Sequence, residues 1–224
     1  GKMRLGFSTM TLLDALSWSV FGNKSASKVL ETGWQKKADE GELLDHVLSA
    51  HRKLPLTSLA DLEKLLAHYA VAVGIPVVPQ LCQRLPTPKE VIEKLGKVIA
   101  EPKYDGLRVQ IHISKKGAKT TIKAFSRSLE DLTHMFPELV KVAEEVNAES
   151  VILDSEAIGI DTTTGELRPF QETITRKRKH GVDDKAADIP IKFFVYDVLS
   201  LNGEDLLLTP LSERKKILKT IFSH

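Results

Sequence analysis

The spacing of the apolar residues changes once along this chain, and that change constrains the possible folds more than any other feature. Up to about Gly74, apolar side chains recur at helical spacing, most clearly from Leu59 to Tyr69. From about residue 98 onward, apolar and polar side chains alternate, as is typical of strands. A segment rich in proline, residues 74–79, separates the two patterns. We therefore expect an α+β fold, with a helical domain at residues 1–74 and a domain with antiparallel sheets at residues 75–224.

Caps, turns and periodicity predict the individual elements. Thr57 or Ser58 is a candidate N-cap, and Thr87 opens a capping box with Pro88 at the first helical position. Two alternating runs joined by a lysine and a glycine predict a β-hairpin. We expect helices at residues 9–21, 25–31, 42–51, 59–69 and 137–146 and after a cap at Thr209 and Pro210, and strands at residues 107–113, 120–125, 150–160 and 191–198.

Composition excludes several classes of protein. The apolar fraction of 42% is ordinary for a soluble globular protein, and no uninterrupted apolar run reaches the length of a membrane span. The single cysteine, Cys82, excludes an intrachain disulfide and fits a reducing compartment. The net charge is only +2, so contact with nucleic acid would come from local patches. We expect an intracellular protein without a membrane partner, cytoplasmic or nuclear depending on its source.

The segment EPKYDGLR, residues 101–108, carries the strongest chemical signal. It places Lys103 between the carboxylates of Glu101 and Asp105, just ahead of Gly106 and Arg108. If the segment is a strand, the three ionisable side chains before the glycine point to one face. A charged lysine is a poor nucleophile, but the metal cation that accompanies a bound nucleoside triphosphate favours the neutral amine, which can attack an α-phosphate. Taken alone, such a segment is more often a solvated surface strand.

Three further clusters lie on later strands or at their ends. Arg127 follows Ser126 after the hairpin, where guanidinium donors suit phosphate oxygens. Asp154 and Glu156 are two positions apart in an apolar strand, so they share a face and need a metal, a cation or a hydroxyl-rich ligand unless that face meets water. Tyr196 can offer a stacking surface to a nucleobase, although most such aromatic residues belong to the core.

A basic run completes the set. It consists of four consecutive cations: Arg176, Lys177, Arg178 and Lys179. Such a run can neutralise phosphates, although it is often only a solvated surface.

Taken together, these clusters resemble motifs I, Ia, III and IIIa of the ATP-dependent DNA ligases, members of the covalent nucleotidyltransferase superfamily. The basic run and the N-terminal residues 4–16 are similar to segments of the replicative-type ligases of archaea and eukaryotes. The resemblance implies that residues 1–74 are the C-terminal part of a helical DNA-binding domain. It implies that residues 75–224 are the N-terminal part of an adenylation domain with an ATP-grasp-like fold.

The resemblance also assigns roles to residues. Lys103 would be the catalytic nucleophile that takes up AMP, and Glu101 would accept a hydrogen bond from the adenine amino group. Arg108 would contact the ribose. Glu156 would bind the ribose hydroxyl and serve the metal-dependent steps, and Tyr196 would stack on the base. Contacts with phosphate or DNA would come from Arg127, Arg176, Lys177, Arg178 and Lys179.

The implied reaction seals a nick in double-stranded DNA with ATP and Mg²⁺, in replication, repair or recombination. Lys103 takes AMP from ATP, AMP passes to the 5′-phosphate, and the adjacent 3′-hydroxyl displaces it. The resemblance implies a monomer, with a sliding clamp as a further partner through segments outside this chain. Motifs IV and V of the family would follow Phe222, so we expect the 224-residue chain by itself to be inactive or very weakly active.

Other functions share part of this pattern. An RNA ligase or an mRNA-capping guanylyltransferase has the lysine motif but lacks the helical segment and the basic run, and a capping enzyme prefers GTP. An NAD-dependent ligase would carry a nicotinamide-binding domain ahead of the lysine. A non-catalytic DNA-binding relic of the fold would have lost the nucleophile motif, whereas Lys103 and Glu156 are both present here.

Overall fold

The computed structural model of the chain describes residues 8–80, 82–117, 119–174 and 190–222. The chain divides into two compact units, residues 1–78 and 79–224, and each unit has its own hydrophobic core. No helix within the described ranges is both long enough and apolar enough to cross a membrane.

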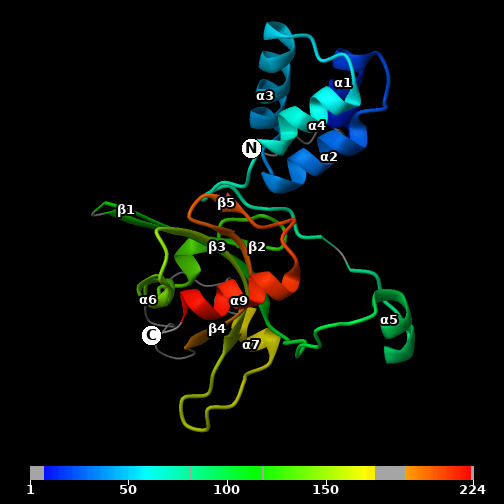
Figure 1. Ribbon diagram of the computed structural model, residues 1–224. Helices are drawn as coiled ribbons and strands as arrows, with labels where there is room; N and C mark the ends of the chain where they lie inside the picture. Colours follow the sequence, from blue (N-terminus) through cyan, green and yellow to red (C-terminus); the bar gives the residue numbers. More distant parts are fainter. Residues whose placement is uncertain (1–7, 81, 118, 175–189, 223–224) are drawn as a thin grey trace. The chain divides into compact units, whose positions relative to one another are not determined.

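The first unit contains four helices among its described residues: α1 (Thr9–Phe21), α2 (Ser27–Lys36), α3 (Glu40–Lys53) and α4 (Leu59–Ala67) (Figure 1). Side chains of Ser8, Asp39 and Ser58 cap α1, α3 and α4 by accepting hydrogen bonds from first-turn N–H groups. Ser58 is therefore the N-cap of α4, rather than Thr57, and it forms a capping box with Asp61. The apolar stripes of the helices meet in a core that includes Leu13, Leu30, Leu43, Val47 and Leu62.

The second unit is built on an antiparallel sheet, which confirms the expected α+β fold. Within the described residues the sheet has five strands in the order β2-β1-β3-β4-β5. The strands are β1 (Leu107–Lys116), β2 (Lys119–Ser126), β3 (Ser150–Gly159), β4 (Ile191–Leu201) and β5 (Glu204–Asp205). The helices are α5 (Pro88–Leu95), η1 (Thr133–Met135), α6 (Leu139–Glu145), α7 (Phe170–Ile174) and α9 (Leu211–Ile221).

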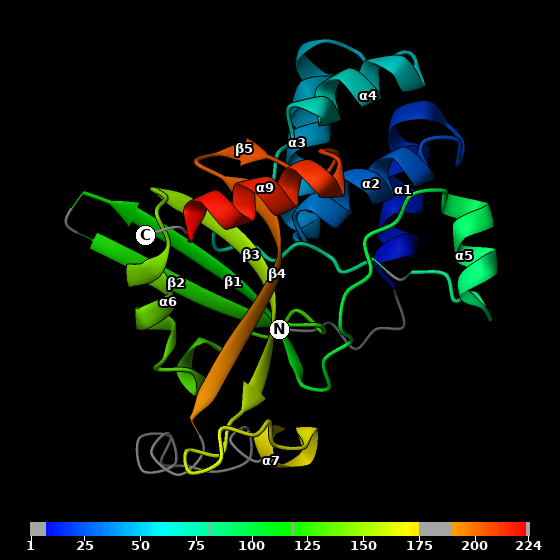
Figure 2. The same cartoon turned by 60° about the horizontal axis from the view of Figure 1, so that its bottom comes forward.

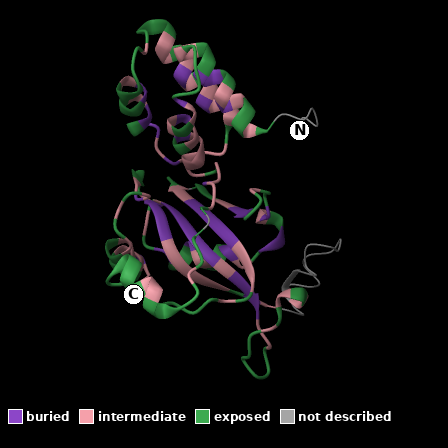
Figure 3. Cartoon of the chain, turned by 90° about the vertical axis from the view of Figure 1, so that its right-hand side faces the viewer, coloured by how far each residue is buried: buried purple, intermediate pink, exposed green. Residues whose placement is uncertain are grey.

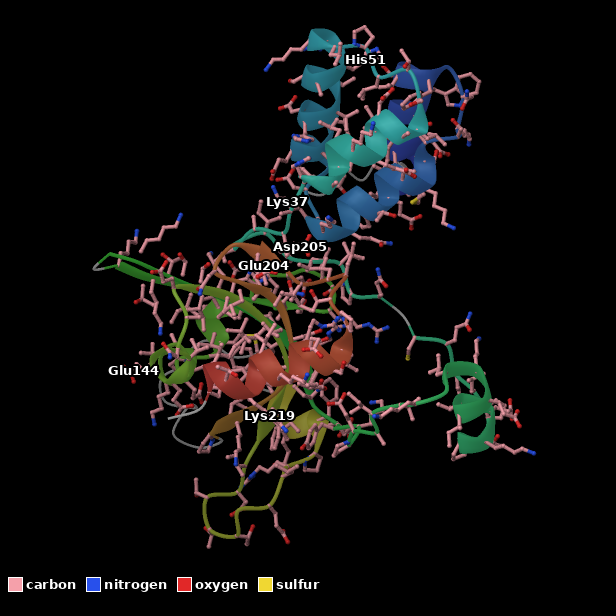
Figure 4. All side chains as sticks on the ribbon, viewed as in Figure 1. Lys37, His51, Glu144, Glu204, Asp205 and Lys219 are labelled. Atoms are coloured by element: carbon pink, nitrogen blue, oxygen red, sulfur yellow. The ribbon has the colours of Figure 1, made fainter. Side chains whose placement is uncertain are left out.

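Alternation along the strands places the main core on one face of the sheet. β1 contributes Val109 and Ile111 to this core, and β3 contributes Val151 and Leu153. Residues of α6 and α9 belong to the same core, and both helices lie along the sheet (Figure 2). The outer sides of these helices are polar, as the exposed side chains of Glu144 and Lys219 illustrate (Figure 4).

The centre of the sheet is buried along β1 and β3 (Figure 3). Residues that alternate with the core positions, such as Arg108 and Glu156, point to the opposite face. That face carries the candidate site.

Two local expectations were wrong. Residues 101–105 are not a strand: they run as irregular chain, and β1 begins only at Leu107. Pro102 has no backbone N–H to offer to a ladder, which disfavours pairing there. The last helix, α9, follows Pro210 without any side-chain cap. The carbonyl of Thr209 instead accepts a hydrogen bond from the Arg214 side chain.

The N-cap expected at α5 is present, but the capping box is not, because the Glu90 carboxylate accepts a hydrogen bond of 2.9 Å from the Thr87 hydroxyl rather than from the Thr87 backbone N–H. Thr87 accepts a hydrogen bond from the N–H of Glu90, and Pro88 occupies the first turn. The helix has no buried residue and stands apart from the sheet (Figure 1).

Candidate active site

Lys103 lies on an irregular segment that several contacts fasten to the sheet. The backbone N–H of Gly106 donates a hydrogen bond of 3.2 Å to Oε1 of Glu156 in β3. The ring of Tyr104 packs on the ring of Phe194 in β4, with 4.4 Å between the centroids. The Lys103 side chain itself is exposed. The segment is thus held just after Lys103, while the Lys103 side chain remains accessible.

Gly106 sits too close to β3 for any side chain. A Cβ atom at this position would lie 2.6 Å from the carbonyl oxygen of Ala157 and 2.7 Å from a side-chain carbon of Ile158. Only glycine therefore allows this approach, which brings the Gly106 N–H to Glu156.

The register of β1 and β3 brings together the charged residues of the site. Arg108 lies directly opposite Glu156, and Asp154 precedes Glu156 by two positions on the same face. The guanidinium of Arg108 donates to both oxygens of Asp154, with Nε 2.9 Å from Oδ1. Of the partners that the sequence left open for these acids, a metal, a cation or a hydroxyl-rich ligand, Asp154 has a cation, Arg108 of the chain itself.

Glu156 is half-buried. Burial raises the pKa of the Glu156 carboxyl above its ordinary value, although the hydrogen bond from Gly106 and the charge of Lys103 oppose this shift. A carboxyl whose charged form is poorly solvated gains from a further cation or a hydroxyl donor. The position suits a ligand that brings one of these.

A β-bulge in β4 places Tyr196 in the site. Asp154 pairs with Asp197, but the next residue, Ser155, pairs with Val195, so Tyr196 is the extra residue. Its hydroxyl donates a hydrogen bond of 3.1 Å to Oδ1 of Asp154. Burial, followed by the negative charge of Asp154, raises the pKa of the phenol, so Tyr196 stays protonated and remains a donor.

Helix α9 holds the remaining side of the site. The ammonium group of Lys215 donates to the Glu101 carboxylate and to the backbone carbonyl of Tyr196. The preceding residue, Arg214, binds both oxygens of Asp197 at 2.8 and 2.9 Å. Glu101 is thus connected to the bulge although it lies outside any strand.

Arg127 lies apart from this network. It is exposed and follows the last residue of β2, Ser126, which pairs with Val109 next to Arg108. Arg127 therefore lies at the same end of the sheet as Arg108. The basic run of Arg176, Lys177, Arg178 and Lys179 falls outside the described residues, as does the N-terminal segment before Ser8.

The described residues contain no cluster of three or more histidine, cysteine, aspartate or glutamate side chains that could hold a metal ion by itself. Glu156 is a single half-buried carboxylate at the position assigned to metal-dependent steps. Mg²⁺ is commonly bound through one or two carboxylates together with substrate phosphates, so this donor set fits a metal that arrives with a nucleotide.

The sequence did not predict the partners of two residues in this network. Asp154 was expected to need a partner, but not to join Arg108 to Tyr196. The pairing of Arg108 with Glu156 across β1 and β3 would have indicated the contact between Arg108 and Asp154. Lys215 lies 114 positions from Glu101, and only the packing of α9 against the sheet brings them together. No local pattern in the sequence predicts that contact.

Comparisons with known proteins identify the family of the chain. The family described as "ATP dependent DNA ligase domain" matches residues 79–224. The chain is 40% identical to the DNA ligase of Caldivirga maquilingensis over 223 residues, and 39% identical to DNA ligase 2 of Thermofilum pendens over 222 residues. Each alignment covers 99% of this chain and 34% of the relative. The chain therefore spans about a third of the length of these curated relatives.

Among solved structures, the ligase domain of LigD from M. tuberculosis is 29% identical, with a TM-score of 0.42 over 54% of this chain and 35% of that chain. The family match, by contrast, covers 79–224 of the 224 residues, including every described residue of the site. The chain therefore belongs to the ATP-dependent DNA ligase domain family.

Proposed function

We propose that the full-length protein containing this chain seals nicks in double-stranded DNA with ATP, through an AMP adduct on Lys103. The observation that carries the proposal is the placement of Lys103. Its side chain is exposed, on a segment that Gly106 fastens to Glu156 of β3 and Tyr104 fastens to Phe194 of β4. Relatives named DNA ligase align with residues of both units, which supports nicked DNA as the substrate.

The first step forms a bond between Nζ of Lys103 and the α-phosphorus of ATP. The bond from that phosphorus to the bridging oxygen breaks, pyrophosphate leaves, and the proton lost by the amine passes to solvent. Bound Mg²⁺ would neutralise charge on the phosphates and so favour the neutral amine. Glu156 would be the protein ligand that holds this metal.

The remaining residues would bind the nucleoside. Two guanidinium nitrogens of Arg108 are used by Asp154, so contact with the ribose falls to Nη1. Tyr196, fixed through its hydroxyl, would offer its ring to the base. Glu101 would accept a hydrogen bond from the adenine amino group, and Arg127 would contact a phosphate.

DNA would be bound by local groups rather than by overall charge, because the net charge is only +2. We assign this role to the helical unit, as part of a DNA-binding domain, and to the basic run at residues 176–179. The protein would act as an intracellular monomer, and a sliding clamp would be recruited through segments outside this chain.

Intact mass spectrometry of the full-length protein, incubated with Mg²⁺ and ATP, tests the proposal. We expect an increase of one AMP in wild type and none in Lys103→Ala, because no other group would take its place as nucleophile. Lys97→Ala is the matched control, since Lys97 is an exposed lysine in the same connecting segment. It should form the adduct as wild type does.

Other outcomes point to other enzymes. An adduct of GMP from GTP would indicate a capping enzyme, and an adduct of AMP from NAD alone would indicate the other ligase class. The absence of any adduct on the folded, full-length protein would leave a DNA-binding relic of the fold.

A further inference from the structure

Lys215 is the residue of α9 that contacts the site most directly. Its ammonium group donates to Oε1 of Glu101 and to the carbonyl of Tyr196. The Lys215 side chain is 20% exposed, whereas that of Glu101 is 41% exposed. The Lys215 cation therefore connects Glu101, which we assign to the adenine amino group, with the backbone of Tyr196, which we assign to stacking on the same adenine.

Glu101 has few other means of orientation. Glu101 lies outside β1, so no hydrogen bonds between strands fix its backbone, and it is exposed. A free glutamate side chain in this setting would sample many rotamers. The ion pair with Lys215 removes most of that freedom.

The bulge itself is held by the same helix. Arg214 donates hydrogen bonds to the carboxylate of Asp197, and Lys215 donates one to the backbone carbonyl of Tyr196. Two consecutive residues of α9 therefore bind two consecutive residues of β4. The next residue differs: Lys216 is 72% exposed and pairs only with Glu213 on its own helix at 2.9 Å. Two adjacent lysines thus have different environments on one helix.

We propose that Lys215 is a positioning residue that makes the site selective for adenine nucleotides. The inference rests on the proposed function, in which Glu101 receives the adenine amino group. Lys215 holds Oε1 and leaves Oε2 free to accept that hydrogen bond. A carboxylate oxygen only accepts hydrogen bonds. The 6-oxo group of guanine offers no donor there and would be rejected.

The test uses the full-length protein and compares ATP with purine riboside triphosphate, which lacks the 6-amino group. The rate of enzyme–AMP or enzyme–nucleotide formation is measured against the concentration of each nucleotide. In wild type, ATP should have the lower KM. Lys215→Met should raise the KM for ATP roughly tenfold, with little change in kcat. The reason is that Glu101 is no longer positioned to accept the hydrogen bond from the adenine amino group. The KM for purine riboside triphosphate should not change.

Two variants serve as controls. Lys215→Arg keeps the positive charge within reach of Glu101 and should retain the preference for ATP. Lys216→Met removes the neighbouring exposed lysine and should keep wild-type values for both nucleotides.

Equal losses with both nucleotides in Lys215→Met would overturn the proposal, because a merely structural role does not depend on the amino group. A wild type that does not distinguish the two nucleotides would also overturn it. Partial misfolding lowers activity with both nucleotides alike, so the ratio of the two KM values still decides. A wild type that takes up no AMP from ATP refutes the proposed function itself, and this is seen before any substitution is made.

Discussion

At the scale of single residues, Asp154 is the group on which the site converges. Its carboxylate accepts two bonds from Arg108 and one from Tyr196, and its side chain is only 5% exposed. Arg108 is 28% exposed and points to the same face as Glu156. Removing the charge of Asp154 would leave this guanidinium half-buried without its counter-charge.

We expect Asp154→Asn to lower the free energy of unfolding by roughly 2–3 kcal/mol, because breaking a buried pair leaves an uncompensated charge. Urea unfolding of the chain measures the change. Glu93→Gln is the control, since its partner Lys89 is 3.8 Å away and both side chains are largely exposed. That control should change stability by less than about 0.5 kcal/mol. Similar effects of the two substitutions would contradict the central place of Asp154.

His112 is a buried histidine on the site face of β1. Its Nε2 lies 2.9 Å from the side-chain oxygen of Gln110, and its ring packs edge-on against Phe125. Burial lowers the pKa of His112 to about 3, so the folded protein holds a neutral imidazole. The unfolded chain, whose histidine pKa is about 6.5, binds this proton more readily.

The stability associated with His112 is therefore present above about pH 6.5 and is lost as the pH falls toward 3. Between pH 7 and pH 5 we expect this residue to account for a loss of about 2 kcal/mol. The measurement is the difference in unfolding free energy between these two pH values. His112→Gln should shrink the difference by that amount, whereas His134→Gln, at an exposed position, should leave it unchanged. An undiminished difference in His112→Gln would show that His112 is not the source.

At the scale of elements, the site depends on how closely the segment before β1 approaches β3. Gly106→Ala would push a methyl group into the Ala157 carbonyl, which is backbone and cannot turn aside. We expect a loss of about 1–3 kcal/mol in stability and slower AMP uptake in the full-length protein, because the bond from Gly106 to Glu156 is disturbed.

Gly41→Ala provides the matched control for this substitution. Gly41 lies in α3, and the nearest atom to an added Cβ is a side-chain oxygen of Asp39 at 3.4 Å. The substitution should be neutral or stabilising by up to about 1 kcal/mol through helix propensity. Loss of stability at both glycines would mean that close approach to β3 is not the reason for the effect at Gly106.

The bulge in β4 is the second decisive element. Because Tyr196 is the unpaired extra residue, its hydroxyl reaches Asp154 across the strand pair. Helix α9 holds the bulge through Arg214 and Lys215. The site is thus assembled from one irregular segment, three strands and one helix.

At the scale of the whole molecule, the chain combines two units with separate cores. The family match covers only the second unit, residues 79–224, whereas the archaeal ligases align with 99% of the chain. The helical unit is therefore shared with those ligases as well. This supports the proposed division of labour between DNA binding and nucleotide chemistry.

Much of the fold could be predicted from the sequence because its signals are local. Periodicity indicated the helices of the first unit, and the hairpin of β1 and β2 followed from alternation around a glycine turn. The strand considered for residues 101–105 is not formed, because a strand also needs a partner and no described strand pairs with these residues.

The sequence by itself determined the chemical groups of the site. These are the nucleophile candidate Lys103, the paired acids Asp154 and Glu156, and Gly106, which follows the lysine by three positions. Only the tertiary structure decided how these groups are used. The register of β1 and β3 brings Arg108 into contact with Asp154, and the bulge in β4 brings Tyr196 to the same carboxylate. The packing of α9 brings Lys215 to Glu101. Residue type and local spacing are properties of neighbouring positions, whereas a partner more than a hundred residues away is chosen by the packing of the core.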